Sequence, residues 1–263
     1  MTTIVVTGSA SGIGAATRAR LLARGARVIG IDLHRCDVVA DLGTLEGRRT
    51  AIDRVRALAG GSLDGIVTCA GVCGLPSRAG SLLVSVNYFG TTALLEGLRE
   101  LLAAGESPAA VAISSNSTTT QPGVPLELVE ACLAGDEAEA RRIGDAVGSL
   151  RGYPASKIAV ARFVRRHAPT PEWIGSGITL NAVAPGATDT PMIAEGRRDP
   201  VIGPAIDRFP IPAGRMARAE EMAALIDFLL GPDARFFAGS VVFADGGTDA
   251  QARPDDWPAP RPS

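Results

Sequence analysis

A glycine-rich turn between a predicted strand and a predicted helix constrains the fold of this chain more than any other feature. The β-branched run Ile4–Val6 leads into Thr7–Gly14, with the sequence TGSASGIG, and a helical pattern of apolar residues follows. In a dinucleotide-binding turn, Gly8 would allow the tight bend, Gly12 the close approach to a pyrophosphate, and Gly14 the packing of helix on sheet. The N-terminus of the helix would offer free N–H groups to the phosphates. The expected contacts of this turn with a dinucleotide are Gly8, Ser11, Gly12, Ile13 and Gly14.

An aspartate at the end of the second predicted strand, Arg27–Asp32, bears on the choice of cofactor. Asp32 follows the glycine-rich turn at the distance where an acid can bond both hydroxyls of an adenosine ribose and would repel a 2′-phosphate. This position favours NAD. An ordinary strand-end aspartate that caps a turn is the alternative. His34 and Arg35 follow closely, and Arg35 could serve a 2′-phosphate, so the choice between NAD and NADP stays open.

Strand and helix patterns alternate along the rest of the chain. This alternation predicts an α/β fold: one doubly wound, Rossmann-type domain with a parallel sheet of about seven strands. We assign residues 1–250 to this dinucleotide-binding catalytic domain and residues 251–263, which are rich in proline, to a flexible tail. The further predicted strands are Val38–Ala40, Asp64–Thr68, Ala109–Ile113, Gly177–Ala184 and Ser240–Ala244, and the further predicted helices are Thr44–Leu58, Ser81–Leu102, Tyr153–His167 and Ala219–Leu230.

Two stretches interrupt the alternation. Residues 116–150 form a helical insertion with two short helices, Pro125–Leu133 and Asp136–Val147. The insertion falls between two candidate site residues and should lie over the site. Its apolar faces also need cover, and the favoured arrangement packs them on the neighbouring long helices. Residues 192–215 form the second stretch, a mobile substrate-loop segment with short helices.

The carboxyl ends of the predicted strands should carry the ligand site, as they do in open α/β sheets. The fourth strand ends in small residues, which would let a cofactor pass close to the backbone. The fifth strand runs into Ser114 and Ser115, and a hydroxyl there could bond a substrate oxygen. The residues expected to border the cofactor at these strand ends are Asp41, Leu42, Cys69, Ala70 and Gly71.

Tyr153 and Lys157 lie four residues apart on a predicted helix and therefore share one of its faces. A phenol titrates near pH ~10. A nearby ammonium would stabilise the phenolate and lower its pKa towards the range useful to a general base. A helical tyrosine and lysine with no joint function is the alternative, because this spacing also arises by chance. Pro154 is tolerated in a first turn, so the helix should begin near Arg151 or Gly152.

Composition excludes several classes of protein. The net charge of −2 argues against a general binder of nucleic acid or of anionic membranes. No apolar run reaches the ~18 residues that a membrane span needs. The chain enters its first strand without a basic region or a cleavage site, so we expect a cytoplasmic protein. No metal site is expected, because the four cysteines form no CxxC pair and neither histidine lies near them; these cysteines are Cys36, Cys69, Cys73 and Cys132.

These motifs resemble those of the short-chain dehydrogenase/reductase family from Thr3 to about Gly247. The turn TGxxxGIG matches the cofactor turn of the family. Thr68–Gly71 departs from the usual Asn-Asn-Ala-Gly and loses an amide side chain, which affects the stabilisation of that strand end. The residues that match the catalytic tetrad are Asn87, Ser115, Tyr153 and Lys157, and those that match the loop on the nicotinamide side are Pro185, Gly186, Thr188 and Thr190.

The resemblance implies a function for each member of the tetrad. Tyr153 would be the general acid–base, and Lys157 would lower its pKa and bond the nicotinamide ribose. Ser115, which the family spacing favours over Ser114, would bond the substrate oxygen. Asn87 would hold a water that links Lys157 to solvent. Without the resemblance, Asn87 could equally be a polar residue that faces solvent. NAD(H) would carry the hydride.

Within the family, the chain most resembles the branch of bacterial 3α-hydroxysteroid dehydrogenases/carbonyl reductases, and coniferyl-alcohol dehydrogenases are similar over the same stretches. The implied reaction interconverts a small-molecule secondary alcohol and its ketone. A dinucleotide-sensing regulator that has lost turnover is the alternative of a different class. We expect a homodimer through the Ala219–Leu230 helix and the Ser240–Ala244 strand, because the insertion should block the other family interface; a tetramer stays possible.

Overall fold

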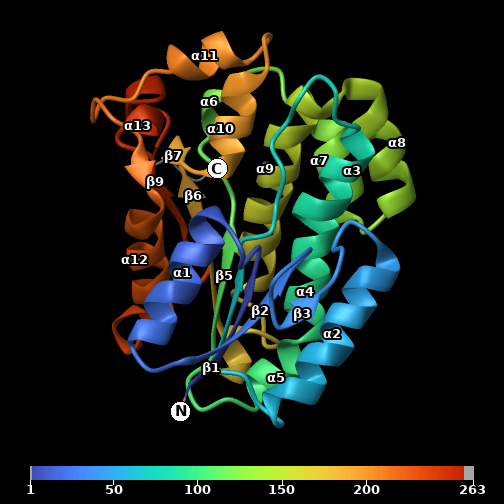
Figure 1. Ribbon diagram of the computed structural model, residues 1–263, viewed down its shortest axis with the longest axis vertical. Coiled ribbons are helices and arrows are strands. Elements are labelled where there is room, and N and C mark those ends of the chain that lie inside the picture. Colours follow the sequence, from blue (N-terminus) through green and yellow to red (C-terminus); the bar gives the residue numbers. More distant parts are fainter. Residues whose placement is uncertain (1, 258–263) are drawn as a thin grey trace, which may run out of the picture.

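A parallel sheet of seven strands forms the centre of the molecule in the computed structural model, which describes residues 2–257 (Figure 1). Its order is β3-β2-β1-β4-β5-β6-β9, so the direction of winding reverses between β1 and β4. The predicted doubly wound, Rossmann-type fold is confirmed, and the reversal marks where such sheets bind ligands. The strands are β1 (Thr3–Thr7), β2 (Arg27–Asp32), β3 (Val38–Val39), β4 (Gly65–Thr68), β5 (Ala109–Ile113), β6 (Thr179–Pro185) and β9 (Val241–Ala244).

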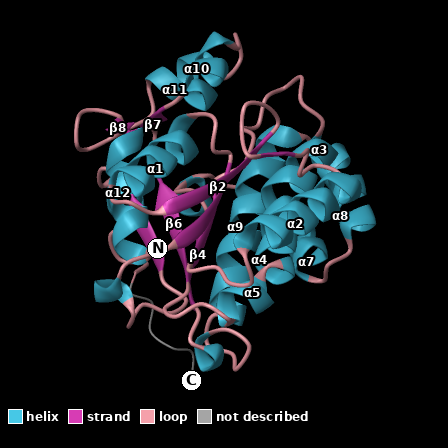
Figure 2. Ribbon diagram, turned by 60° about the horizontal axis from the view of Figure 1, so that its bottom comes forward, coloured by secondary structure: helices cyan, strands magenta, loops and turns pink. Residues whose placement is uncertain are grey.

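Helices cover both faces of the sheet (Figures 1 and 2). Successive residues of β1 therefore enter separate cores: Val5 packs with α2, α4 and α9, whereas Val6 packs with α1 and α12. Burial on both faces explains why the strands read as continuous apolar runs in the sequence. These helices are α1 (Gly12–Ala23), α2 (Leu45–Ala59), α4 (Thr91–Gly97), α9 (Ser149–His167) and α12 (Ala219–Leu229).

The helix predicted over Ser81–Leu102 is interrupted, and the prediction of one continuous helix was wrong. It consists of α3 (Gly80–Val84), a π-helical turn (Ser85–Gly90), α4 and α5 (Arg99–Ala103). A π-helical turn closes its hydrogen bonds over five residues instead of four. Apolar residues continue on both sides of it, so the sequence pattern gives no sign of the change. The turn buries Asn87 completely.

Helix α9 begins at Ser149, earlier than the predicted start near Arg151 or Gly152. Gly148, with φ of 77°, turns the chain into the helix, and its carbonyl accepts a hydrogen bond from the N–H of Gly152 at 2.9 Å. Pro154 consequently lies inside the helix, where its missing N–H leaves one carbonyl of the preceding turn without a helical partner.

The insertion, residues 116–150, forms α6 (Ser117–Thr120), α7 (Leu126–Leu133) and α8 (Glu137–Val147). Helix α7 packs against α9, and α8 packs against α3 and α7 on the flank of the molecule (Figure 1). The prediction that the apolar faces pack on neighbouring long helices is confirmed. The expectation that the whole insertion lies over the site is wrong, because burial of these faces holds α7 and α8 at the side.

The remaining elements lie in the last third of the chain. Helices α10 and α11 occupy the 192–215 segment, where short helices were predicted. Helix α13 and a two-stranded sheet of β7 and β8 were not predicted. The tail predicted over 251–263 begins inside α13, and residues 258–263 lie outside the described part. The bounds are α10 (Pro191–Arg198), α11 (Gly203–Asp207), α13 (Thr248–Ala252), β7 (Thr188–Asp189), β8 (Ala217–Arg218), and two 3₁₀ turns at Ile174–Ser176 and Pro232–Ala234.

The contact between α3 and α8 depends on a missing side chain. A Cβ at Gly80 would lie 1.9 Å from the Gly144 carbonyl oxygen, so Gly80→Ala should force the two helices apart. We expect the free energy of unfolding to fall by roughly 2–3 kcal/mol. Gly152→Ala is the matched control, because a Cβ there meets nothing closer than 3.8 Å and alanine favours a helix. Urea denaturation measures both variants, and equal stabilities would contradict the prediction.

Candidate active site

A cleft at the carboxyl ends of β1, β4, β5 and β6 brings together nearly all of the predicted site residues. Its volume is about 740 Å³. Among the predicted site residues, Asn87 alone does not line it. The predicted residues that do are Gly8, Ser11, Gly12, Ile13, Gly14, Asp32, Asp41, Leu42, Cys69, Ala70, Gly71, Ser115, Tyr153, Lys157, Pro185, Gly186, Thr188 and Thr190.

The glycine-rich turn has the geometry that a dinucleotide pyrophosphate requires. Gly8 and Gly12 have φ of 63° and 52°, values that favour glycine. A Cβ at Gly8 would lie 2.9 Å from the Ala70 backbone, and one at Gly14 would lie 2.1 Å from the Gly8 carbonyl oxygen. The Ser11 side chain makes no capping hydrogen bond to α1, so the first N–H groups of the helix remain available to an anion. These residues fit a dinucleotide.

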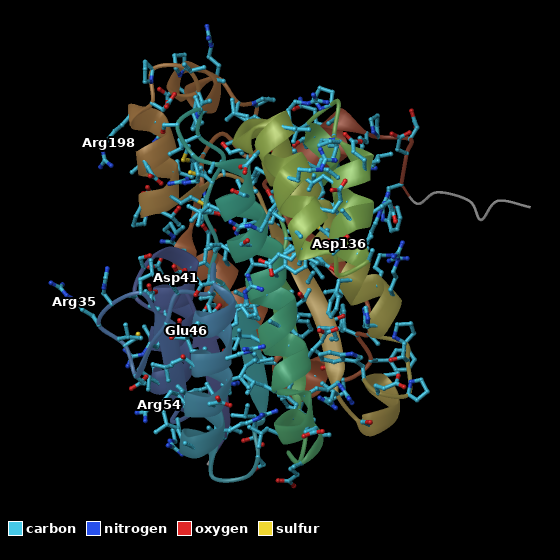
Figure 3. The ribbon with its side chains drawn as sticks, turned by 90° about the vertical axis from the view of Figure 1, so that its right-hand side faces the viewer. Arg35, Asp41, Glu46, Arg54, Asp136 and Arg198 are labelled. Carbon is cyan, nitrogen blue, oxygen red and sulfur yellow. The ribbon has the colours of Figure 1, made fainter. Side chains whose placement is uncertain are left out.

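Asp32 makes the turn-capping contacts that were considered as the alternative, and it also lines the cleft. Its Oδ2 accepts a hydrogen bond from the Ala10 N–H at 2.9 Å, and its Oδ1 accepts one from the Leu33 N–H at 2.7 Å. The carboxylate therefore braces the glycine-rich turn while lining the cleft. Arg35 lies on a loop at the edge of the molecule, as Figure 3 shows, and neither Arg35 nor His34 lines the cleft.

Two hydrogen bonds join the middle of α9 to the end of β5. Lys157 Nζ donates to the Ile113 carbonyl at 2.9 Å, and Ser114 Oγ donates to the Lys157 carbonyl at 3.0 Å. Ser114 is thus engaged by the backbone of α9. The neighbouring Ser115 lines the cleft, and its Oγ accepts a hydrogen bond from the Ser117 N–H at 3.1 Å. The junction places Ser115 beside the face of α9 that carries Tyr153.

Burial dominates the ionisation of the Tyr153–Lys157 pair. It lowers the pKa of Lys157 to about 8. It raises the pKa of Tyr153, while hydrogen bonding to Ser115 acts in the opposite direction. Lys157 Nζ lies 6.0 Å from the centroid of the Tyr153 ring and donates to a carbonyl instead. The expectation that Lys157 lowers the pKa of Tyr153 is therefore wrong for the protein by itself.

Asn87 holds the chain segment that follows β4. Its side chain is fully buried, which excludes the solvent-facing alternative. Its Oδ1 accepts a hydrogen bond from the Val72 N–H at 2.8 Å, and its Nδ2 donates to the Val72 carbonyl at 3.0 Å and to Ser156 Oγ at 3.3 Å. Thr7 Oγ1 accepts a hydrogen bond from the Ala70 N–H at 2.9 Å. Thr7 and Asn87 together hold the strand end that lacks the usual amide side chain.

The cleft continues into an apolar region. From the sequence, most of this region was predicted only as the substrate-loop segment 192–215, without individual residues. Four of its wall residues follow the helical spacing i, i+3, i+4, i+7, and this pattern in residues 202–209 could have identified them. An ion pair of 2.8 Å between Arg78 and Glu195 joins the loop after β4 to α10 beside this region. The residues that line it are Val72, Cys73, Gly74, Leu150, Met192, Ile193, Ile202, Ala205, Ile206 and Phe209.

The cysteines and acidic residues were candidates for a disulfide or a metal site. All four cysteines are free. Within residues 2–257, no group of three or more His, Cys, Asp or Glu side chains is arranged to hold a metal ion. In the same part of the chain, none of the helices combines the length and the apolar character that crossing a bilayer would need.

Comparison with known proteins identifies the family. A family model described as enoyl-(acyl carrier protein) reductase matches residues 140–249. A 3-alpha-hydroxysteroid dehydrogenase/carbonyl reductase of Comamonas testosteroni is 43% identical over 98% of this chain and 100% of its own length. The chain belongs to the short-chain dehydrogenase/reductase family.

Two further relatives are similar to this dehydrogenase/reductase over nearly all of their length. A 3-alpha-hydroxysteroid dehydrogenase from Pseudomonas sp. B-0831, solved in complex with NADH, is 46% identical with a TM-score of 0.93, and the match covers 97% of this chain and 100% of that one. A coniferyl-alcohol dehydrogenase of a Pseudomonas species is 31% identical over 93% of this chain and 95% of its own length.

The buried Lys157 makes the stability of this dehydrogenase/reductase depend on pH. Its pKa falls from 10.5 to about 8 on folding. Between these values the unfolded chain binds more protons, so the free energy of unfolding should rise with pH. Lys157→Met removes this titration. At neutral pH the free energy of unfolding should be larger for the variant than for the wild type. This difference should shrink from about pH 8 upwards. Urea denaturation across this range tests the prediction, and a difference that does not change with pH would contradict it.

Proposed function

We propose that this enzyme interconverts a secondary alcohol and its ketone with NAD(H) as the cofactor. The observation that carries the proposal is the convergence of Ser115, Tyr153 and Lys157 in one cleft with the glycine-rich turn. Membership of a family of dehydrogenases and reductases supports the reaction class. The cytoplasmic location remains a prediction from the sequence.

The chain's own residues account for binding and proton transfer. Tyr153 would exchange a proton with the substrate oxygen, and Ser115 would donate a hydrogen bond to the same oxygen as its negative charge develops. Lys157 would hold the nicotinamide ribose, with its ammonium already positioned by the Ile113 carbonyl. Asn87 would act indirectly, by fixing the Val72 backbone beside the cleft. When bound, the nicotinamide supplies or accepts the hydride.

The choice of NAD over NADP rests on the charge at the adenosine end of the cleft. Asp32 lines this end, and a carboxylate there accepts hydrogen bonds from ribose hydroxyls and repels a 2′-phosphate. Arg35, the cation considered for a 2′-phosphate, does not line it. The complex of a 46% identical relative with NADH is consistent with this choice.

A hydroxysteroid or a related carbonyl compound is the substrate class that we favour. The substrate end of the cleft is walled mainly by aliphatic and aromatic side chains, which suit a large apolar molecule. Two relatives of more than 40% identity are described as 3-alpha-hydroxysteroid dehydrogenases. An aryl alcohol of the coniferyl type is the second candidate, supported by the relative of 31% identity.

Tyr153→Phe tests the mechanism. It removes the transferable proton and keeps the ring, so turnover should fall by about three orders of magnitude or more while NADH affinity stays close to that of the wild type. Tyr88→Phe is the matched control, because Tyr88 is the other tyrosine of the chain, is buried and does not line the cleft. Turnover is followed by NADH absorbance with steroids, quinones and aryl alcohols, and with NAD and NADP in parallel.

Each proposal has an outcome that would contradict it. Near-wild-type turnover of Tyr153→Phe would exclude Tyr153 as the acid–base. A preference for NADP would show that Asp32 does not set the cofactor. NADH binding without turnover of any substrate would instead favour the dinucleotide-sensing regulator.

Assembly as a homodimer completes the proposal. Helices α7 and α8 pack on α9 and α3 and would block an interface through these helices. On the opposite side, β9 is an edge strand of the sheet, and the side chains of Phe228 on α12 and of Phe236 are exposed. A two-fold interface through α12 and β9 would cover this surface. Light scattering at micromolar concentration should give about twice the chain mass of 27.0 kDa, and a tetramer would contradict the blocking argument.

A further inference from the structure

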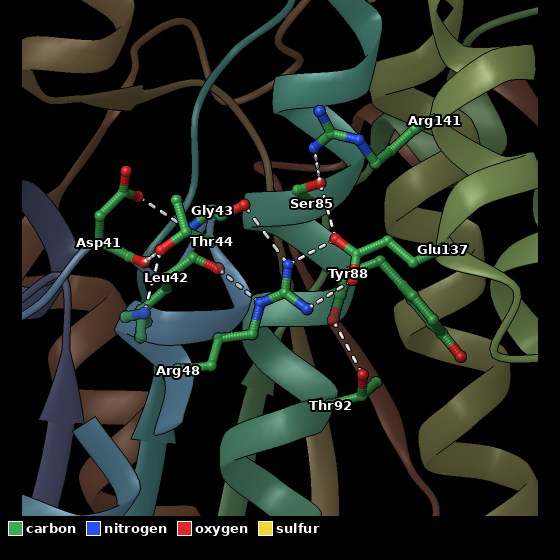
Figure 4. A network of polar contacts seen from close by, with 11 residues as sticks. Asp41, Leu42, Gly43, Thr44, Arg48, Ser85, Tyr88, Thr92, Glu137 and Arg141 are labelled. Atoms are coloured by element: carbon green, nitrogen blue, oxygen red, sulfur yellow. Dashed lines mark hydrogen bonds and ion pairs between the residues drawn. The ribbon is translucent and has the colours of Figure 1, made fainter. Parts of the chain in front are cut away.

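A partly buried ion pair between Arg48 and Glu137 connects the insertion to the wall of the cleft (Figure 4). Arg48, in the first turn of α2, is 4% exposed. Its guanidinium is bound in parallel by the carboxylate of Glu137, the first residue of α8, with Nη1–Oε2 at 2.7 Å and Nη2–Oε1 at 2.5 Å. The same guanidinium donates to the Leu42 carbonyl from Nε at 2.9 Å and to the Gly43 carbonyl from Nη2 at 3.4 Å.

Glu137 also binds the π-helical turn. Ser85 Oγ donates to Glu137 Oε1 at 2.8 Å, and Arg141 donates to Ser85 Oγ at 2.7 Å. Burial acts to raise the pKa of Glu137, but hydrogen bonds from Arg48 and Ser85 and the charges of Arg48 and Arg141 outweigh it and lower the pKa. The carboxylate therefore stays ionised and connects three segments that are distant in the sequence.

The loop held by Arg48 has few contacts with the sheet: Leu42 packs in the core, and Gly43 N–H donates to Asp41 Oδ1 at 2.8 Å within the loop itself. The loop follows β3, which is two residues long, and Asp41 and Leu42 in it line the adenosine end of the cleft. Leu42 lies between Arg48 and the π-helical turn, where a Cβ added at Gly90 would approach the Leu42 Cβ to 3.1 Å. The position of this wall thus depends on contacts outside the sheet.

Stability alone explains this pair poorly. A cation in the first turn of a helix is unfavourable, because the N-terminus carries partial positive charge. An ion pair that is largely removed from water, as this one is, also adds little stability over apolar residues of similar size. Arg48 does provide donors for the carbonyls of Leu42, which lines the cleft, and of the adjacent Gly43, and apolar residues could not.

We propose that Arg48 and Glu137 are positioning residues, through which the insertion sets the shape of the adenosine end of the cleft and hence the affinity for the dinucleotide. This inference rests on the proposed function, which assigns that end of the cleft to NAD(H). No residue of α8 lines the cleft, so its effect should fall on binding and spare the chemical step.

Three variants separate positioning from a merely structural effect. Glu137→Gln replaces one acceptor oxygen by a donor that repels Arg48. Arg48→Met with Glu137→Leu replaces the pair by apolar side chains, which should preserve stability but leaves the Leu42 and Gly43 carbonyls without donors. Glu139→Gln is the matched control, because Glu139 lies on the same helix, its side chain is 41% exposed, and its carboxylate pairs with Arg142.

The affinities of NADH and ADP-ribose are measured by fluorescence titration and by competition, together with kcat at saturating cofactor and urea denaturation. We expect Glu137→Gln and the double variant to weaken both ligands by about tenfold, equivalent to about 1.4 kcal/mol, with kcat changed by less than about twofold. The double variant should recover the stability lost in Glu137→Gln without recovering affinity. Glu139→Gln should match the wild type.

Unchanged affinity in Glu137→Gln and the double variant would overturn the inference. Recovery of affinity together with stability in the double variant would also overturn it, because the pair would then be merely structural. If the wild-type protein does not bind NADH, the proposed function is overturned, and the inference with it. The titration of the wild type with NADH distinguishes this outcome from the others.

Discussion

The junction between Lys157 and the end of β5 is the contact on which the catalytic arrangement depends. It runs in both directions, from Lys157 Nζ to the Ile113 carbonyl and from Ser114 Oγ to the Lys157 carbonyl. Tyr153 lies one turn earlier on the same helix, so fixing Lys157 against the sheet also fixes the phenol relative to Ser115. The insertion lies between β5 and α9 in the sequence, but the residues of the junction lie outside it. The chain could therefore acquire two extra helices at this point without displacing the catalytic residues.

Burial at this junction has a chemical cost. It lowers the pKa of Lys157 to about 8 and raises that of Tyr153, so both shifts favour the neutral forms. Lys157 therefore does not supply the activation that the Tyr–Lys spacing suggests, and only the hydrogen bond to Ser115 acts to lower the pKa of Tyr153. The main contribution of the fold is position: a hydroxyl, a phenol and an amine held in one cleft beside a turn suited to phosphates.

Features set by local requirements could be predicted from the sequence. The bounds of β2 were predicted to the residue, since a strand buried on both faces is a continuous apolar run between turns. The glycine-rich turn was predictable because Gly8 and Gly14 leave no room for a Cβ. Features set by distant contacts were not. The start of α9 depends on the backbone of Gly148, and the ion pair of Arg48 joins it to a residue 89 positions away.

At the π-helical turn Ser85–Gly90, the number of residues determines where the side chains point, and it matters more for the site than their hydrophobicity. Asn87 faces Val72 near the catalytic end, while Ser85 faces Glu137 near the adenosine end. Deleting one residue would restore α-helical spacing and rotate the residues before the deletion by about 100° relative to the residues after it. The composition would hardly change, yet one of these two side chains would lose its partner. The relative orientation of the side chains at the two ends of the cleft thus depends on the number of residues in this turn. A one-residue gap here between two related chains would mark a larger structural difference than many substitutions.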